Sequence, residues 1–390
     1  MQIAFVTETY PPEINGVALT VARAVAFLRE QRHGVDVVRP SQAGESHGDA
    51  ERDGGSEWRS AGWPIPVYRE ARFGVAWPAV LARRFARAGT QLVHVATEGP
   101  LGRAAVIAAR RLGLPVTSDF RTNFHRYSRY YGLGFLGPVI GAYLRNFHNA
   151  TDCTFVPTTR CRDELALAGF DRLRVVGRGV DLERFSPLHR DAALRLSWGH
   201  HGSSPVLLYV GRLAAEKKVE LALQAFRRAR AYVPLARMVV VGDGPRRVAL
   251  ERDYPEVRFI GMQTGAALAA CYASADLFVF PSESETFGNV TLEALASGLP
   301  VVAFDSAAAA EHVVDRVSGR LVAPGDDDAF VMATCLATTL HDFSRAGVAS
   351  IATRRSVEAQ SWPAVLERFE RQLLEVAFDA EQIRYASVAA

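Results

Sequence analysis

The sequence predicts an α/β fold of two doubly wound, Rossmann-like domains that face a central cleft. Short apolar, β-branched runs alternate with longer segments of helical period, which is typical of a parallel sheet covered by helices on both faces. The alternation breaks off once, in a polar stretch around residues 181–203, and starts again at Val206. The 390 residues also exceed what a single hydrophobic core usually serves.

The expected elements follow this alternation in order. In the first half we expect strands at 3–6, 35–38, 92–95, 116–117, 154–156 and 174–176, with helices such as 20–30 and 101–112 between them. In the second half we expect strands at 206–210, 238–241, 257–260, 277–280 and 301–304. The polar, glycine-rich segment 44–55 is interpreted as a surface loop. The domains are expected at 1–188 and 189–360, followed by a C-terminal helix over 361–390 that can cross back to the first domain.

Composition narrows the class of protein. Hydrophobic residues make up 49% and charged residues 22% of the chain, as in an ordinary globular protein, and the net charge of +3 gives no support to a nucleic-acid partner. No run approaches the roughly 20 apolar residues of a spanning helix, and the N-terminus is interpreted as a first strand, so we expect a cytoplasmic protein. The four cysteines lack metal-ligand spacing and are interpreted as small buried apolar residues.

The strongest candidate site is the string ETFGNVTLE at 285–293, which follows an expected strand. A helix that begins near Gly288 presents unpaired backbone N–H groups and a positive dipole end, which together suit a diphosphate. The glycine allows close approach of that anion. Carboxylates beside a diphosphate need another partner, so Glu285 and Glu293 are expected to meet sugar and ribose hydroxyls. The alternative is that they only complement the helix dipole.

A second string, GRLAAEK at 211–217, directly follows the expected strand 206–210. Arg212, with its planar fork, and Lys217, as a mobile point charge, are placed to bracket a diphosphate. Such cations stabilise the charge that builds on a departing phosphate. Lys218 is interpreted as a solvated charge.

Together, GRLAAEK and SESETFGNVTLEALASGLPVV (282–302) resemble the signature of family 4 glycosyltransferases, a retaining group with the GT-B fold. The opening TYPPEINGV (9–17) is similar to that family's N-terminal glycine loop, and the likeness covers nearly the whole chain. The resemblance implies transfer of a hexose, with mannose favoured, from a nucleotide-diphosphate sugar held by the second domain to a lipid or glycan acceptor held by the first. The segment SDFRTNFH (118–125) looks most like bacterial GDP-mannose-dependent α-mannosyltransferases and sulfoquinovosyl- or glucosyl-lipid synthases.

The same resemblance implies roles for individual residues. Arg212 and Lys217 would hold the diphosphate, Glu285 would meet the donor sugar and Glu293 the ribose. Backbone groups would cradle the donor at Phe287, Gly288, Asn289 and Val290 in the second domain and at Asn15 and Gly16 in the first. Many family members carry a histidine near the reacting sugar. Here Arg121 occupies that position and a histidine follows only at His125, so both are candidates.

Three further interpretations concern cofactors, other functions and the membrane. The triplet Asp326–Asp328 is interpreted as a helix start, no G-x-G-x-x-G follows the first strand, and neither a metal nor NAD is expected. The alternatives are a UDP-sugar-dependent glycolipid synthase, a nucleotide-sugar epimerase and a non-catalytic nucleotide-sugar-binding subunit. The arginine-rich stretch 69–87, interleaved with aromatic residues, suits either a peripheral contact with the anionic inner face of the plasma membrane or a plain surface helix.

Overall fold

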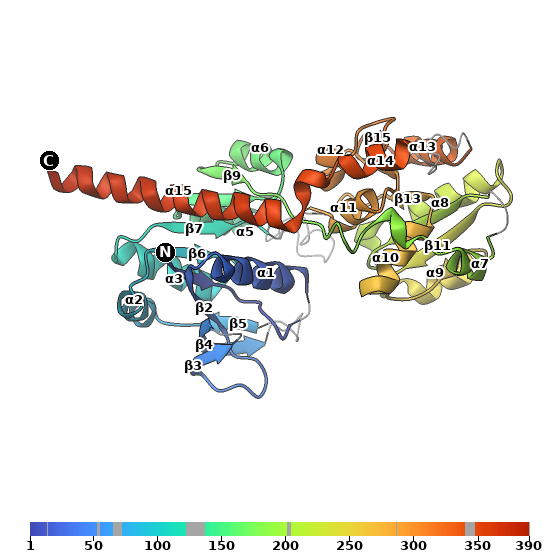
Figure 1. Ribbon diagram of the computed structural model, residues 1–390. Coiled ribbons are helices and arrows are strands. Elements are labelled where there is room, and N and C mark those ends of the chain that lie inside the picture. The colour runs from blue at the N-terminus through green and yellow to red at the C-terminus, as the bar shows by residue number, and fades with distance from the viewer. Residues whose placement is uncertain are drawn as a thin grey trace. The chain divides into compact units, whose positions relative to one another are not determined.

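The computed structural model describes residues 1–13, 15–52, 55–64, 72–121, 137–200, 204–285, 287–339 and 348–389. They form two units, Met1–Val176 with Leu366–Ala390, and Gly177–Val365 (Figure 1). Each unit is an α/β domain built on a mainly parallel sheet, so the predicted fold class is confirmed for both.

The N-terminal unit is organised around its first strand. Its strands are β1 (Gln2–Val6), β2 (Gly34–Pro40), β3 (Gly48–Arg52), β4 (Gly55–Pro64), β5 (Arg72–Val75), β6 (Leu92–Val95), β7 (Val116–Asp119), β8 (Cys153–Val156) and β9 (Leu173–Val175). The sheet order is β3-β4-β2-β1-β6-β7-β8-β9, with β5 paired to β4. Because the chain passes from β1 to β2 on one side and later to β6 on the other, the carboxyl ends of β1 and β6 form a topological switch point, where ligands of such sheets usually bind.

Helices flank this sheet. They are α1 (Gly16–Glu30), α2 (Pro78–Arg87), α3 (Pro100–Arg111), α5 (Gly137–His148), α6 (Thr159–Leu167) and the later part of α15 (Trp362–Ala389). The C-terminal helix belongs to the core of this unit, since the ring of Phe369 packs against those of His94 and Phe155 with centroids 5.1 and 5.5 Å apart.

The interpretation of residues 44–55 as a surface loop is wrong. Part of the segment is the edge strand β3, which pairs antiparallel with β4 from Gly48↔Arg59 to Arg52↔Gly55. The polar composition misled us because an edge strand over solvent has no apolar face to bury. Its stability comes from backbone hydrogen bonds to β4, which itself pairs in parallel with β2.

The C-terminal unit is a second doubly wound domain. Its strands are β10 (Val206–Val210), β11 (Arg237–Val241), β12 (Arg258–Phe259), β13 (Leu277–Phe280), β14 (Val301–Phe304) and β15 (Gly319–Val322). All pair in parallel, in the order β12-β11-β10-β13-β14-β15. The main helices are α7 (Ala192–Ser197), α8 (Val219–Arg230), α9 (Arg247–Asp253), α10 (Gly265–Ser274), α11 (Asn289–Ala296), α12 (Ala307–His312), α13 (Asp327–Thr339) and α14 (Val348–Arg355). The switch point of this sheet lies between β10 and β13.

Apolar strands and helix faces form the cores. Val206, Leu207 and Leu208 of β10 are fully buried, as expected for a central strand covered on both faces. All four cysteines are free thiols, three of them buried and Cys161 partly exposed. None of the helices in the described ranges combines the length and the hydropathy that a membrane span requires.

Candidate active site

The topology of the C-terminal unit brings the two predicted donor-binding strings together. β10 and β13 are neighbours, paired through Leu207↔Leu277, and both run toward the same edge of the sheet. The loop with Arg212 and Lys217 follows β10, and the loop with Glu285 follows β13. Both strings therefore lie at the carboxyl ends of the strands that flank the switch point.

Lys217 and Glu285 form an ion pair at this edge. The Lys217 Nζ lies 2.5 Å from the Glu285 Oε1, and the Ser282 hydroxyl donates to the same oxygen over 3.1 Å. Both side chains keep a small exposed fraction, 12% for Lys217 and 19% for Glu285. Because they remain accessible, the cation and the carboxylate can both contact a ligand that carries phosphate and hydroxyl groups.

Arg212 stands at the same strand end. Its Nη1 lies 3.9 Å from the Glu216 Oε1, and half of the arginine side chain is exposed while Glu216 is nearly buried. The backbone around Arg212 is tightly placed, because a Cβ at Gly242, after β11, would lie 2.0 Å from the carbonyl oxygen of Gly211. Only glycine fits where the ends of β10 and β11 approach so closely.

The predicted helix start near Gly288 is confirmed. Gly288 precedes α11 with φ of 87°, in the left-handed region, and no side chain within the described ranges caps the helix. Phe287 is buried, and its carbonyl accepts from the N–H of Ala308 over 2.7 Å. Val290 and Asn289 are half-buried in the first turn of the helix. The first N–H groups of α11 are thus available to an anion.

Glu293 forms a hydrogen bond with another residue of the C-terminal unit. Its Oε2 accepts a hydrogen bond from the Tyr272 hydroxyl over 2.9 Å, and Tyr272 is fully buried against Phe185 and Phe278. Burial raises the pKa of Glu293 to about 7, although the bond from Tyr272 and the charge of Arg184 lower it. This half-buried carboxyl therefore titrates near neutral pH.

In the N-terminal unit, Asn15 and Gly16 form the start of α1. The Asn15 Oδ1 accepts from the N–H groups of Val17 and Ala18 over 3.1 and 2.8 Å, and so caps the helix. Gly16 is exposed, and a Cβ added to it would meet no atom of the described residues within 4 Å. Packing against the described residues therefore does not require glycine at this position.

Arg121 is tied to a buried carboxylate. Its Nε donates to the Asp119 Oδ2 over 2.7 Å, and the Nε2 of the fully buried His94 lies 3.1 Å from the same oxygen. Burial raises the pKa of Asp119, but the charges of Arg121 and His94 and their hydrogen bonds outweigh it and lower the pKa to about 2. His125, the other candidate for this position, lies outside the described residues.

Sequence reasoning missed two buried carboxyls at the switch point of this unit. Glu8, after β1, accepts from the N–H groups of Gly74 and Leu101 over 2.7 and 2.9 Å, and burial raises its pKa to about 7. Glu98, after β6, places its Oε1 3.6 Å from the His148 Nε2. An acidic residue two or three positions after the end of an apolar strand was the available signal for both.

The acidic triplet begins a helix, as predicted. The Asp326 Oδ1 accepts from the N–H of Ala329 over 2.9 Å, and Asp327 accepts from the Lys218 Nζ over 2.9 Å. Lys218 also donates to Glu283 over 2.7 Å, so its interpretation as a solvated charge is wrong. Across the described part of the chain, no group of three or more His, Cys, Asp or Glu side chains gathers as metal ligands.

Comparison with known proteins identifies the family. Residues 14–184 match the family described as "Glycosyltransferase Family 4", and residues 204–339 match "Glycosyl transferases group 1". The chain is 37% identical to a GDP-mannose-dependent alpha-mannosyltransferase of Mycolicibacterium smegmatis, over 94% of this chain and 95% of that protein. It is 30% identical to the sulfoquinovosyl transferase SQD2 of Arabidopsis thaliana, over 95% of this chain and 73% of that protein.

Solved structures agree on the fold. The sucrose-phosphate synthase of Thermosynechococcus elongatus superposes with a TM-score of 0.74 at 20% identity, covering 97% of this chain and 99% of the other. Anabaena HepE in complex with UDP superposes with a TM-score of 0.72 at 18% identity, covering 96% and 100%. The predicted resemblance is confirmed: the chain belongs to family 4 of the glycosyltransferases, retaining GT-B enzymes that transfer a hexose from a nucleotide sugar.

Proposed function

We propose that this enzyme transfers mannose from GDP-mannose, with retention of configuration, to a lipid or glycan acceptor. The observation that carries the proposal is the 37% identity, over 94% of this chain, to a GDP-mannose-dependent alpha-mannosyltransferase. A second candidate is a UDP-sugar-dependent glycolipid synthase, favoured by the 30% identity to SQD2 and the 28% identity to an alpha-monoglucosyldiacylglycerol synthase of Streptococcus pneumoniae.

The diphosphate of the donor is assigned to Arg212, Lys217 and the start of α11. The half-exposed guanidinium of Arg212 and the Lys217 ammonium stand at the end of β10. The helix start at Gly288, which no described side chain caps, follows the neighbouring β13. These groups supply fixed positive potential at one edge of one sheet. Because that potential comes from the chain itself, we propose that catalysis needs no metal ion.

Carboxylates and backbone groups are assigned to the remaining contacts with the donor. Glu285 is assigned to hydroxyls of the transferred sugar, and its contact with Lys217, which is assigned to the diphosphate, supports this. Glu293 is assigned to the ribose. The backbone of residues 287–290 would cradle the phosphates and the sugar. Asn15 and Gly16 are assigned a donor contact from α1, which the open space around Gly16 among the described residues supports.

In the proposed mechanism, the acceptor attacks C1 of the sugar from the face that the leaving group occupies. The bond between C1 of the sugar and the diphosphate oxygen breaks, which leaves an oxocarbenium-like sugar. The acceptor oxygen forms the new bond to C1 on the same face, and a phosphate oxygen of the leaving group takes the acceptor's proton. Arg212 and Lys217 stabilise the charge on the diphosphate as it departs. Arg121 and His125 both remain candidates for a contact with the reacting sugar, and single alanine variants of each distinguish them.

The proposed setting is the cytoplasmic face of a membrane, with the enzyme held peripherally. The exposed residues Trp77, Arg83 and Arg87, at and along α2, support such a contact, because aromatic and basic side chains suit the interface of an anionic bilayer.

A transfer assay tests donor and acceptor together. The enzyme is given GDP-mannose, UDP-glucose or UDP-sulfoquinovose with either a lipid extract or soluble oligosaccharides, and labelled product is partitioned between organic solvent and water. Product from GDP-mannose alone supports the first candidate, whereas product from a UDP-sugar alone supports the second. Hydrolysis or epimerisation without transfer to any acceptor contradicts both.

A further inference from the structure

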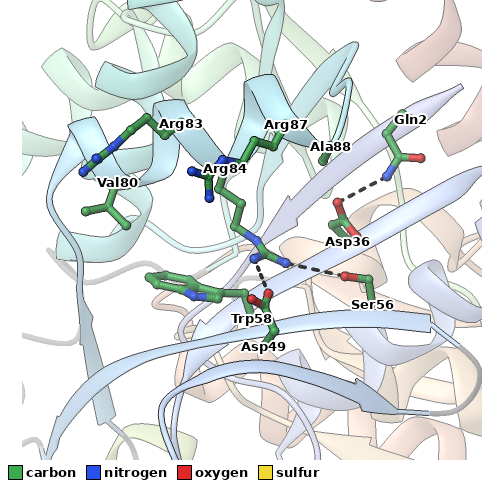
Figure 2. Close-up of a pocket in the computed structure, with 10 residues that line it drawn as sticks. All are labelled: Gln2, Asp36, Asp49, Ser56, Trp58, Val80, Arg83, Arg84, Arg87 and Ala88. Atoms are coloured by element: carbon green, nitrogen blue, oxygen red, sulfur yellow. Dashed lines mark hydrogen bonds and ion pairs between the residues drawn. The ribbon is translucent and has the colours of Figure 1, made fainter.

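A pocket of about 650 Å³ lies beside α2 in the N-terminal unit. Its wall combines α2 with the strands β3 and β4 and with the amino ends of β1 and β2. The lining residues include Arg83, Arg84 and Arg87 of α2, Trp58 of β4, and Asp36 of β2 (Figure 2). Volumes of roughly 300–1,000 Å³ are typical of sites for small molecules.

Arg84 is part of the wall. Figure 2 shows its side chain reaching from α2 to the two strands, where it pairs with Asp49 and lies 3.5 Å from the Ser56 hydroxyl. Its guanidinium also lies over the ring of Trp58, 5.8 Å from the centroid. The charge of Arg84 is thus balanced by Asp49, and its position is fixed by three contacts.

Arg83 and Arg87 are different, because they leave positive charge in the pocket. Both side chains are exposed, and neither forms an ion pair with a carboxylate of the described residues. The remaining acid of the wall, Asp36, is nearly buried and accepts from the Gln2 Nε2 over 3.2 Å. The lining therefore contains three arginines and two aspartates.

We propose that this pocket binds a phosphate ester that carries hydroxyl groups, either as a free small molecule or as the headgroup of a lipid. The guanidinium groups of Arg83 and Arg87 match phosphate oxygens in charge and in geometry. Asp36 accepts from a hydroxyl, and the Ser56 hydroxyl donates to one. A bare phosphate fills only a small part of the pocket.

The pocket is separate from the candidate active site. Gln2 and Asp36 stand toward the amino ends of β1 and β2, whereas Glu8 and Arg121 follow the carboxyl ends of β1 and β7 at the opposite edge of the same sheet. A ligand here does not compete for the residues assigned to the donor or the reacting sugar. The proposal is independent of which sugar the enzyme transfers.

Titration calorimetry on the full chain tests the soluble arm, with glycerol 3-phosphate and inorganic phosphate as probes. The test variant is Arg83→Gln/Arg87→Gln. The matched control is Arg111→Gln/Arg228→Gln, which removes the same charge from two other exposed arginines. We expect the test variant to weaken glycerol 3-phosphate binding at least roughly tenfold, because two charge-assisted contacts are lost, and the control to bind like the wild type.

Asp36→Asn should change the affinity for inorganic phosphate in the opposite direction to Arg83→Gln/Arg87→Gln. Removing a negative charge from the wall should tighten the binding of inorganic phosphate. It should also reduce the preference for glycerol 3-phosphate, because the strongest acceptor for a hydroxyl is gone.

Sedimentation with vesicles distinguishes the two sources of the ligand. Binding to phosphatidylglycerol vesicles but not to phosphatidylcholine vesicles, lost in Arg83→Gln/Arg87→Gln, kept in the control and displaced by glycerol 3-phosphate, identifies a lipid headgroup in the pocket. Vesicle binding that glycerol 3-phosphate does not displace is a surface contact of α2 and counts against the pocket. Glycerol 3-phosphate binding without such sedimentation identifies a free phosphate ester. The proposal is overturned if neither glycerol 3-phosphate nor phosphatidylglycerol vesicles bind. It is also overturned if the test variant and the control lose binding equally, because binding would then depend on the net charge of the protein and not on this pocket.

Discussion

The Lys217 Nζ lies 2.5 Å from the Glu285 Oε1, although 68 positions separate the two residues in the sequence. One follows β10 and the other follows β13, and the two strands pair in parallel. The ion pair therefore forms where the carboxyl ends of these two strands lie side by side. It brings together the cation proposed to bind phosphate and the carboxylate proposed to bind hydroxyls. The first prediction addresses this pair.

Replacing either partner should remove most turnover and leave the fold intact. Lys217→Ala deletes the charge proposed to stabilise the leaving diphosphate, and Glu285→Ala deletes the proposed contact with the sugar. Loss of one such preorganised contact costs about 3 kcal/mol of barrier, or on the order of a hundredfold in kcat. Steady-state kinetics measure the loss, and circular dichroism checks the fold. Lys218→Gln is the matched control, because Lys218 pairs with Glu283 and Asp327 instead. Near-normal turnover in both alanine variants would remove the pair from the active site.

Tyr272→Phe should weaken nucleotide binding through Glu293. The variant keeps the buried ring and loses only the hydroxyl that donates to the Glu293 Oε2. A hydrogen bond contributes about 1 kcal/mol to a neutral group and more to a charged one, so we expect a rise of roughly fivefold or more in the dissociation constant of GDP, with little change in kcat.

A deoxynucleotide provides the control for this variant. Wild type and Tyr272→Phe should bind 2′,3′-dideoxy-GDP equally, because that ligand has no ribose hydroxyls for Glu293. Equal weakening of both nucleotides would mean that Tyr272 only supports the fold. If the wild type itself does not discriminate between them, the ribose is assigned to the wrong residue.

The stability of the N-terminal unit should fall as pH rises through neutrality, owing to Glu8. Burial raises the pKa of Glu8 from 4.5 to about 7, so the folded state binds its proton more tightly than the unfolded state does. Between these two values the folded state holds more protons, and each rise in pH then costs stability. From about pH 5.5 to about pH 8 this one group removes about 2 kcal/mol.

Urea unfolding at both pH values, in wild type and Glu8→Gln, measures that contribution. The variant has no carboxyl to titrate at this position, so its free energy of unfolding should change less between the two conditions. An identical pH dependence in the two proteins would show that Glu8 titrates normally.

Transfer activity should persist in excess EDTA. In the proposed site, Arg212, Lys217 and the start of α11 supply the positive charge that a metal ion would otherwise bring to the diphosphate. Initial rates before and after chelation provide the measurement. Loss of activity on chelation, with recovery on addition of magnesium or manganese, would contradict the proposal of metal-independent catalysis.

The sequence by itself determined the fold class and the strings that carry the candidate site. Continuous apolar runs such as β10 predict central parallel strands, because a strand covered on both faces needs apolar side chains throughout. The order of strand, loop and helical segment around residues 277–300 predicted a helix start near Gly288, and the structure has this glycine in the left-handed conformation just before α11. These signals are local and can be read from a few neighbouring residues.

Only the tertiary structure decided which of these residues come into contact and which residues, distant in sequence, form hydrogen bonds with them. The strand β3 escaped prediction because its pairing with β4 supports it, and Tyr272 and Asp119 became relevant only when folding brought them against Glu293 and Arg121. The raised pKa of Glu8 likewise comes from surroundings contributed by β5 and α3. Burial and long-range hydrogen bonds depend on chain segments far apart in sequence, and no local pattern encodes them.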